Sequence, residues 1–415
     1  MASTLLGGLS PHQFLRRHWQ KRPLLIRGAI PAFRDPVTAA QLLALAARDD
    51  VESRLVRERG GARRWEVVEG PLPARVVPKL ETTHWTVLVQ NVDAHLPAVA
   101  DLIDRFDFLP RWRVDDVMIS LAAAQGSVGP HVDSYDVFLL QGRGRRRWRV
   151  AERFAQGYLP GLDLRILRGF RAESDWVLGP GDMLYLPPGV AHHGVALEPC
   201  LTYSIGFRAP STYDLVAGFL QRVVGGVDRT QLYTDPDLSP VREPGEISAA
   251  ALARLYRVVV RASRPRAADF VRFAGEHLTE RRLTEGDAPR SRPSAAAALA
   301  RALRGGAALV RRPGARVAFV RRGRGAILFA DGRPWNLPPA LAGVAPLLTR
   351  RRRIDAASLR PHLLRRGMEA LLAELVSARV FDVEGRARRP ASSATRRGRP
   401  GSRRGPGSRS TRGRR

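Results

Sequence analysis

The chain has 415 residues, of which 44% are hydrophobic, enough for two or three domains with a sizeable buried core. No stretch approaches the ~20 uninterrupted apolar residues that a membrane-spanning helix needs. The N-terminal segment lacks an apolar run followed by a small-residue cleavage site, so we expect no secretory signal. The one cysteine, Cys200, excludes an intramolecular disulfide, and together these features predict a cytoplasmic protein.

The net charge is strongly positive, at +30. Residues 386–415 contain twelve arginines and no acidic residue, which leaves +18 on the first 385 residues. Nearly all the cations are arginine, since Lys21 and Lys79 are the only lysines. Such charge attracts polyanions, and RNA is the leading candidate partner of the basic surface and tail. A basic surface that only keeps the protein in solution is the alternative.

The first 106 residues are expected to alternate helices with strands. Helical apolar spacing occurs in residues 11–19, 38–48 and 96–106. Strands are predicted at residues 22–30, 51–56, 63–70 and 85–92.

Residues 116–207 have a different pattern, in which short strand-forming runs recur between Gly and Pro turns. The turns GPGD (179–182) and LPPG (186–189) enclose one such strand, MLYL. Many short alternating strands at this spacing predict an all-β barrel or sandwich.

Helical periodicity returns after Pro210, in residues 212–224, 247–263 and 266–282. Residues 284–293 are predicted to be a linker. The unit that follows combines an alanine-rich helix, two β-runs and helices near 338–349, 355–366 and 368–378, a mixture that resembles a winged-helix domain. The Gly-, Pro-, Ser- and Arg-rich tail lacks the apolar residues that would order it, so we expect disorder there.

His131-Val132-Asp133 is an H-x-D pair on a predicted strand. Residues i and i+2 of a strand point to the same face, so both side chains can reach one metal ion. His192, directly after the LPPG turn, is the candidate third ligand. Two imidazoles and one carboxylate form the facial triad that suits non-haem iron(II), with positions left open for a bidentate cosubstrate and O2.

Other histidines compete for the role of third ligand. His193 would face the opposite side of the strand from His192, so only one of the two can bind the metal. His84 and His95 lie near the β-region, but neither has a carboxylate two residues away on the same strand, and we expect structural roles for both.

The sequence resembles the JmjC-type ribosomal oxygenases, and most closely the bacterial members that hydroxylate an arginine of ribosomal protein L16. The resemblance is dense over residues 1–215 and looser up to about residue 385. It is carried by five segments: FLRRHWQKRPLLIRGAI, HWTVLVQNVD, GSVGPHVDSYDVFLLQGRGRRRWRV, GDMLYLPPGVAHHGVALE and YSIGFRAPS.

The resemblance implies an α+β fold built on a double-stranded β-helix, the jelly-roll barrel of cupin and JmjC proteins. It also implies that His192, and not His193, is the third ligand. The expected domains are a catalytic domain (1–210), a helical dimerisation region that makes the protein a homodimer (211–290), a winged-helix-like domain (294–385) and the disordered tail (386–415).

Strand parity selects a cosubstrate residue in the run RRRWRV. Trp148 and Val150 are expected to face the barrel interior, and Arg146 shares their parity. Its guanidinium can hold the distal carboxylate of 2-oxoglutarate with two hydrogen bonds. By resemblance, Ser120 and Thr202 would hydrogen-bond the same cosubstrate, although a core role fits each of them equally well.

The resemblance thus implies a dioxygenase that uses iron(II), 2-oxoglutarate and O2 to hydroxylate C3 of an arginine in L16. An acidic residue should then pair with the substrate guanidinium, and Asp115, Asp116 and Asp136 are the candidates. The alternatives are an oxygenase acting on histidine of another ribosomal protein and a non-catalytic RNA- or ribosome-binding cupin protein.

Overall fold

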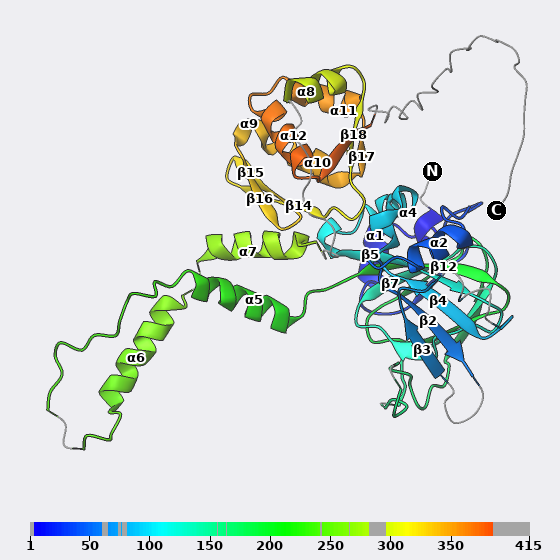
Figure 1. The fold of residues 1–415 in the computed structure, drawn as a ribbon, viewed down its shortest axis with the longest axis horizontal. Helices are drawn as coiled ribbons and strands as arrows, with labels where there is room; N and C mark the ends of the chain where they lie inside the picture. Colours follow the sequence, from blue (N-terminus) through cyan, green and yellow to red (C-terminus); the bar gives the residue numbers. More distant parts are fainter. Residues whose placement is uncertain are drawn as a thin grey trace, which may run out of the picture.

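The computed structural model describes residues 4–59, 65–73, 76, 81–155, 157–162, 164–240, 243–264, 266–281 and 296–384. These residues form a β-barrel unit, three helices that extend away from it, and a smaller C-terminal unit (Figure 1). The predicted linker at 284–293 and the predicted tail at 386–415 lie outside the described residues.

The barrel consists of two antiparallel sheets, with strand orders β1-β10-β7-β12-β5-β4-β2-β3 and β6-β11-β8-β9. This interleaved order is that of a double-stranded β-helix, as the family resemblance implies. The strands are β1 (Leu24–Ile26), β2 (Ser53–Glu58), β3 (Trp65–Glu69), β4 (Trp85–Val89), β5 (Val114–Ala122), β6 (His131–Val132), β7 (Asp136–Gln141), β8 (Arg146–Ala151), β9 (Ser174–Leu178), β10 (Met183–Leu186), β11 (Ala191–Ala196) and β12 (Cys200–Phe207).

Helices cover the outer face of the larger sheet. The capping boxes Ser10–Gln13 and Thr38–Gln41 begin the first two α-helices by satisfying backbone N–H groups at their N-termini. The elements are η1 (Thr4–Leu6), α1 (Pro11–Arg17), α2 (Ala39–Ala46), α3 (Val92–His95), α4 (Pro97–Ile103), η3 (Asp104–Phe106) and η4 (Arg111–Arg113). The predicted helices at residues 11–19, 38–48 and 96–106 are present as α1, as α2 and as α4 with η3. The short helices η1 and η4 were not predicted, and residues 92–95 form a helical turn where a strand end was predicted.

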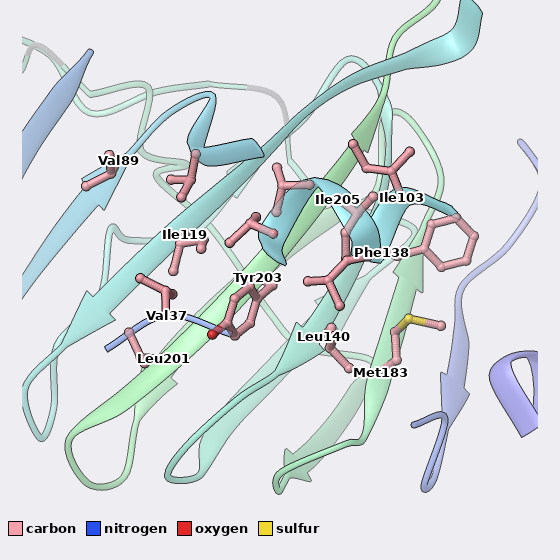
Figure 2. Close-up of a cluster of buried hydrophobic side chains, with 14 of the residues drawn as sticks. Val37, Val89, Ile103, Ile119, Phe138, Leu140, Met183, Leu201, Tyr203 and Ile205 are labelled. Atoms are coloured by element: carbon pink, nitrogen blue, oxygen red, sulfur yellow. The ribbon is translucent and has the colours of Figure 1, made fainter. Parts of the chain in front are cut away.

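The main hydrophobic core lies between these helices and the sheet. Figure 2 shows Ile119, Leu140 and Tyr203 in this cluster, side by side on neighbouring strands. Because strand side chains alternate, the intervening residues Ser120, Leu139 and Thr202 point to the other face, which is the barrel interior. The apolar packing outside the barrel therefore holds the interior face in position.

Three helices follow the barrel, as predicted: α5 (Thr212–Gly225), α6 (Ala249–Ala262) and α7 (Ala267–Thr279). Phe219 of α5 packs against Phe273 of α7, with ring centroids 5.4 Å apart. On another side α7 meets the C-terminal unit, where a Cβ on Gly275 would come within 2.3 Å of the Phe329 ring. Glycine is required at this crossing. None of the helices in the described ranges combines the length and apolar character needed to cross a membrane.

The C-terminal unit surrounds its own hydrophobic core with helices and two three-stranded sheets, β17-β13-β18 and β14-β15-β16. The predicted hairpin is β14–β15, whereas the predicted helix at 338–349 is two short helices separated by Gly343 and Val344. The elements are α8 (Ala296–Arg304), β13 (Ala308–Arg311), β14 (Val317–Arg322), β15 (Gly325–Ala330), β16 (Arg333–Leu337), α9 (Pro339–Ala342), α10 (Ala345–Arg350), β17 (Arg353–Ile354), α11 (Ala356–Leu363), α12 (Met368–Ser377) and β18 (Phe381–Glu384).

Candidate active site

His131, Asp133 and His192 come together inside the barrel. The pairing of β6 with β11 places His131 directly opposite His192, and their ring centroids are 4.3 Å apart. The Asp133 carboxylate lies 3.9 Å from Nε2 of His131 and 3.6 Å from Nε2 of His192. One ligand atom from each residue lies within 4.8 Å of the others, so the three can reach one ion.

Backbone carbonyls set the tautomer of both imidazoles. Nδ1 of His131 lies 2.9 Å from the Gly129 carbonyl oxygen, and Nδ1 of His192 lies 3.1 Å from that of Val190. A carbonyl only accepts, so each Nδ1 carries the proton and each Nε2 presents its lone pair to the centre of the site. Burial, reinforced by the neighbouring His131, lowers the pKa of His192 to about 4, which keeps this imidazole neutral at physiological pH.

His193 faces away from this centre. Its Nε2 lies 3.0 Å from Oγ of Ser127, which also accepts the Gly129 N–H at 3.0 Å. The structure thus separates His192 from His193 as strand parity predicts. His84, whose Nδ1 lies 2.8 Å from Oγ1 of Thr83, and His95, at the end of α3, both lie outside the group of three.

Ser127 supports the orientation of His131 indirectly. Its hydroxyl accepts the Gly129 N–H, and the Gly129 carbonyl accepts the Nδ1–H of His131. We predict that Ser127→Ala lowers affinity for Co(II), a redox-stable substitute for iron(II), by about tenfold, the loss typical of removing a group that orients a ligand. Calorimetric titration with Co(II) measures this affinity. Ser53→Ala is the matched control, since Ser53 is equally buried and bonds the Ala46 carbonyl far from the site. Equal Co(II) affinity in the two variants would contradict this role for Ser127.

Arg146 projects across the barrel from β8, as the parity of the strand predicts. The alternation along β8 buries Arg146, Trp148 and Val150, while Arg147 is exposed. The outward arginines pair at the surface: Arg147 lies 2.9 Å from Asp175.

The guanidinium of Arg146 is fully buried and meets hydroxyl groups. Its Nη1 donates to Oγ of Ser120 at 3.0 Å and to Oγ1 of Thr202 at 3.2 Å, and Thr202 in turn donates to Gln141. Its Nε has no hydrogen-bond partner among the described residues. Burial lowers the pKa of Arg146, and no carboxylate within the described ranges forms an ion pair with it. A buried cation without a counter-charge is a site for an anion.

The metal-site residues and the Arg146 guanidinium line the same cavity, which has a volume of about 350 Å³. It is lined by the three metal-site residues, by Arg146 with Ser120 and Thr202, and by apolar and aromatic side chains that include Leu139, Trp148, Met118 and Tyr135. The arrangement can therefore hold a metal ion and, beside it, a small molecule with a carboxylate at its far end.

The three candidate acids have different surroundings. Asp136 is completely buried and accepts hydrogen bonds from Tyr185, Gln20 and Arg113, so it belongs to the core. Asp115 faces the C-terminal unit, 3.6 Å from Arg316. Asp116 has the same parity on β5 as Met118 and Ser120, which line the cavity. Strand parity thus places Asp116 on the same face of β5 as these two cavity residues.

Trp148, which was expected to face the barrel interior, lies 5.4 Å from the Arg146 guanidinium. Sequence reasoning missed three other residues that position the site: Gln141 supports Thr202, and Ser127 and Gly129 set the His131 ring. Only Gly129 left a signal, since its φ of +78° fits the GPH turn. Tyr135 also lines the cavity, and burial, with the charges of Asp133 and Asp116, raises its pKa.

Comparison with known proteins gives matches over nearly the whole chain. Residues 101–215 match the family model described as a JmjC domain, and residues 262–381 match that of the ROXA-like winged helix. The ribosomal protein uL16 3-hydroxylase of Escherichia coli is 37% identical over 380 residues, which cover 90% of this chain and 97% of that protein. A probable ribosomal oxygenase of Haemophilus influenzae is 38% identical over 56% of this chain and 55% of its own length.

Solved structures agree with these matches. A structure of E. coli YcfD superposes with a TM-score of 0.77 at 36% identity, covering 91% of this chain and 98% of its own. A structure of the E. coli ribosomal oxygenase YcfD in complex with cobalt and 2-oxoglutarate gives a TM-score of 0.75 at 36% identity, and one in complex with cobalt and succinic acid gives 0.74 at 36% identity.

Proposed function

This chain belongs to the JmjC-domain ribosomal oxygenases, the family of the E. coli uL16 3-hydroxylase, and from that premise we propose that it hydroxylates C3 of an arginine in ribosomal protein L16 (uL16). The reaction would use iron(II), 2-oxoglutarate and O2. The observation that carries the proposal is one cavity that contains both a three-residue metal site and a buried arginine without a counter-charge.

The residues present fit both groups. His131, Asp133 and His192 would hold iron(II), because two imidazole nitrogens and one carboxylate form the donor set of non-haem iron oxygenases. Arg146, with Ser120 and Thr202, would bind the distal carboxylate of 2-oxoglutarate. When bound, iron(II) supplies O2 activation coupled to oxidation of 2-oxoglutarate to succinate and carbon dioxide. The chain itself orients the substrate carbon and keeps water out of the apolar cavity.

The substrate guanidinium requires an acidic partner, and we assign that role to Asp116. It has the same strand parity on β5 as Met118 and Ser120, which line the cavity, whereas Asp115 has the opposite parity. Its charge, like those of Asp133 and Asp115, contributes to the raised pKa of Tyr135, which also lines the cavity. Its Oδ2 accepts the Asn91 N–H at 2.8 Å, which fixes the carboxylate. A carboxylate held at this position can accept paired hydrogen bonds from an arginine that enters the site.

We predict that Asp116→Asn lowers kcat/KM for an L16 peptide by about a hundredfold, because a charged hydrogen-bonded pair is lost in a desolvated site. Affinity for 2-oxoglutarate should stay unchanged, which calorimetry can check. Asp115→Asn is the control on the adjacent, outward-facing position. Wild-type peptide kinetics in the Asp116 variant would exclude it as the substrate's partner.

The deciding experiment for the function is incubation of the full chain with iron(II), 2-oxoglutarate and purified ribosomal proteins, followed by peptide mass spectrometry. The expected product is L16 with one added oxygen atom on a single arginine. Oxygen added to a histidine of another ribosomal protein would show that the substrate is that protein and not L16, while the oxygenase reaction itself would stand. Absence of 2-oxoglutarate turnover with every ribosomal protein would favour the non-catalytic alternative.

We also propose that the chain forms a homodimer through α5 and α6. Neither helix buries any residue within this chain, although both are amphipathic. Tyr213, Val216, Leu220 and Val224 form an apolar stripe on α5 at helical spacing, and Tyr213 is 79% exposed. Leu252, Leu255, Tyr256 and Val259 form a second stripe on α6. Exposed apolar stripes of this length are interfaces in soluble proteins, and a second copy is the partner always present.

Tyr256→Asp should convert the dimer to a monomer, because it places a charge within the apolar stripe of α6. Light scattering coupled to size-exclusion chromatography measures the mass. Arg261→Glu, a charge change on the opposite face of the same helix, should leave the dimer intact. A wild-type mass that is already monomeric would refute the proposal.

The positive charge supports our proposal that the protein binds the ribosome or its RNA. This binding would take place in the cytoplasm, where ribosomal proteins are synthesised. Within the described residues, Arg321, Arg322 and Arg324 project from the β14–β15 turn, and the arginine-rich residues 386–415 add to the same field. Binding to ribosomal RNA should then weaken steeply with added salt.

A further inference from the structure

A second, larger cavity lies between the barrel and the C-terminal unit. Its volume is about 600 Å³. The barrel contributes the turns before β2 and before α3 together with η4, and the C-terminal unit contributes residues 311–317 between β13 and β14. Seven arginine side chains and four acidic side chains line it, so its wall is cationic. It shares only Gln90 with the cavity of the metal site.

Two of the four acids in the lining already have basic partners. Asp115 lies 3.6 Å from Arg316, and Asp50 pairs with Arg48. Asp93 is buried, accepts the Val117 N–H at 2.8 Å, and has a pKa raised to about 6 by burial. Outside the lining, Asp101 lies 2.6 Å from Arg352. The Asp115–Arg316 and Asp101–Arg352 pairs join the two units.

Two arginine side chains of the lining and one backbone N–H converge on the carboxylate of Asp104. Arg111 pairs with it, Nη2 of Arg311 lies 3.9 Å away, and the backbone N–H of Arg352 donates to it at 2.9 Å. Nε of Arg111 is buried with no partner among the described residues.

Arg311 has less negative charge close to its guanidinium than Arg111 or Arg352 has. It is only 6% exposed, and its other contact, to the Thr349 carbonyl, is long at 3.4 Å. Burial, with Arg111 as a neighbour, lowers the pKa of Arg311 to about 9. A buried guanidinium with two long contacts lacks part of the counter-charge that buried ions require.

We propose that this cavity is a binding site for a phosphate-class oxyanion, held by Arg311 and Arg312 of the C-terminal unit and by Arg111 of the barrel. Guanidinium groups that approach from different directions suit a tetrahedral anion with several acceptor oxygens. Because both units contribute arginines, the bound anion would also strengthen their contact. The shared chemistry has two sources, free inorganic phosphate and the backbone phosphate of RNA.

The test uses the full chain and inorganic phosphate, with chloride at matched ionic strength as the reference. Saturable binding in calorimetry, with a rise in the melting temperature, is expected. Arg311→Met and Arg312→Gln should each weaken binding by about tenfold, the loss typical of one charge-assisted hydrogen bond. Arg312 is partly exposed, with its Nε 3.5 Å from Asp382, so its variant stays informative if the buried substitution impairs folding. Arg360→Gln, on the exposed face of α11, is the matched control.

A single-stranded RNA oligomer distinguishes the two sources. If the oligomer competes with phosphate, and this competition is lost in the Arg312 variant, RNA is the physiological ligand class. If phosphate binds and the oligomer does not compete, the ligand is a free anion. Either result supports the site. Non-saturable phosphate binding, equal affinity in all variants, or saturation by succinate but not by phosphate would overturn the proposal. Hydroxylation of L16 is measured separately, so failure of this site leaves the proposed function untouched.

Discussion

The His192→Ala variant is expected to form no succinate above background and to incorporate no oxygen into L16. His192 provides one of three protein donors. Its Nδ1 carries the ring proton, which it donates to the Val190 carbonyl, so Nε2 has the only lone pair available to a metal. Its low pKa keeps that lone pair free at neutral pH. Loss of this donor leaves two ligands, too few to hold iron(II) in a facial arrangement.

Two measurements make the result specific. Succinate is quantified by mass spectrometry, and Co(II) titration should show lost metal affinity while the melting temperature of the metal-free protein stays close to wild type. His12→Ala, an exposed histidine on α1, should behave as wild type in both. Normal succinate formation by the His192 variant would remove it from the metal site.

Arg146→Ala should weaken 2-oxoglutarate binding by about a hundredfold or more, because the variant removes the buried cation that pairs with the distal carboxylate. Metal affinity should change little. The unliganded protein should lose no stability through a broken ion pair, since Arg146 has no carboxylate partner among the described residues.

Arg147→Ala is the matched control for this variant. It removes the same side chain from the next position of β8, but Arg147 points outward and pairs with Asp175 at the surface. Calorimetry with 2-oxoglutarate in the presence of Co(II) measures both variants. Equal affinity in the two would mean that the cosubstrate is held elsewhere in the cavity.

Strand periodicity explains why so much of the site could be predicted from the sequence. A strand repeats every two residues, so the apolar positions Trp148 and Val150 already determine where Arg146 points. The same rule separates His192 from His193. The long-range pairing of His131 with His192 has no local signal, and the family resemblance supplied it.

Tertiary contacts explain what the sequence could not decide. Asp115, Asp116 and Asp136 are chemically alike, and only the packed structure shows that Asp136 is in the core and that Asp115 faces the C-terminal unit. Ser127 acts through a turn whose carbonyl orients a side chain elsewhere. The strands β13, β16, β17 and β18 contain two to five residues, too few for periodicity to show.

The position of β11 within the smaller sheet links the metal site to the cosubstrate site. This strand pairs with β6 on one side and β8 on the other, so continuous pairing within one sheet fixes the spacing between the metal ligands and the strand that carries Arg146. We therefore expect any substitution that disturbs the pairing of β11 to weaken metal binding and cosubstrate binding together.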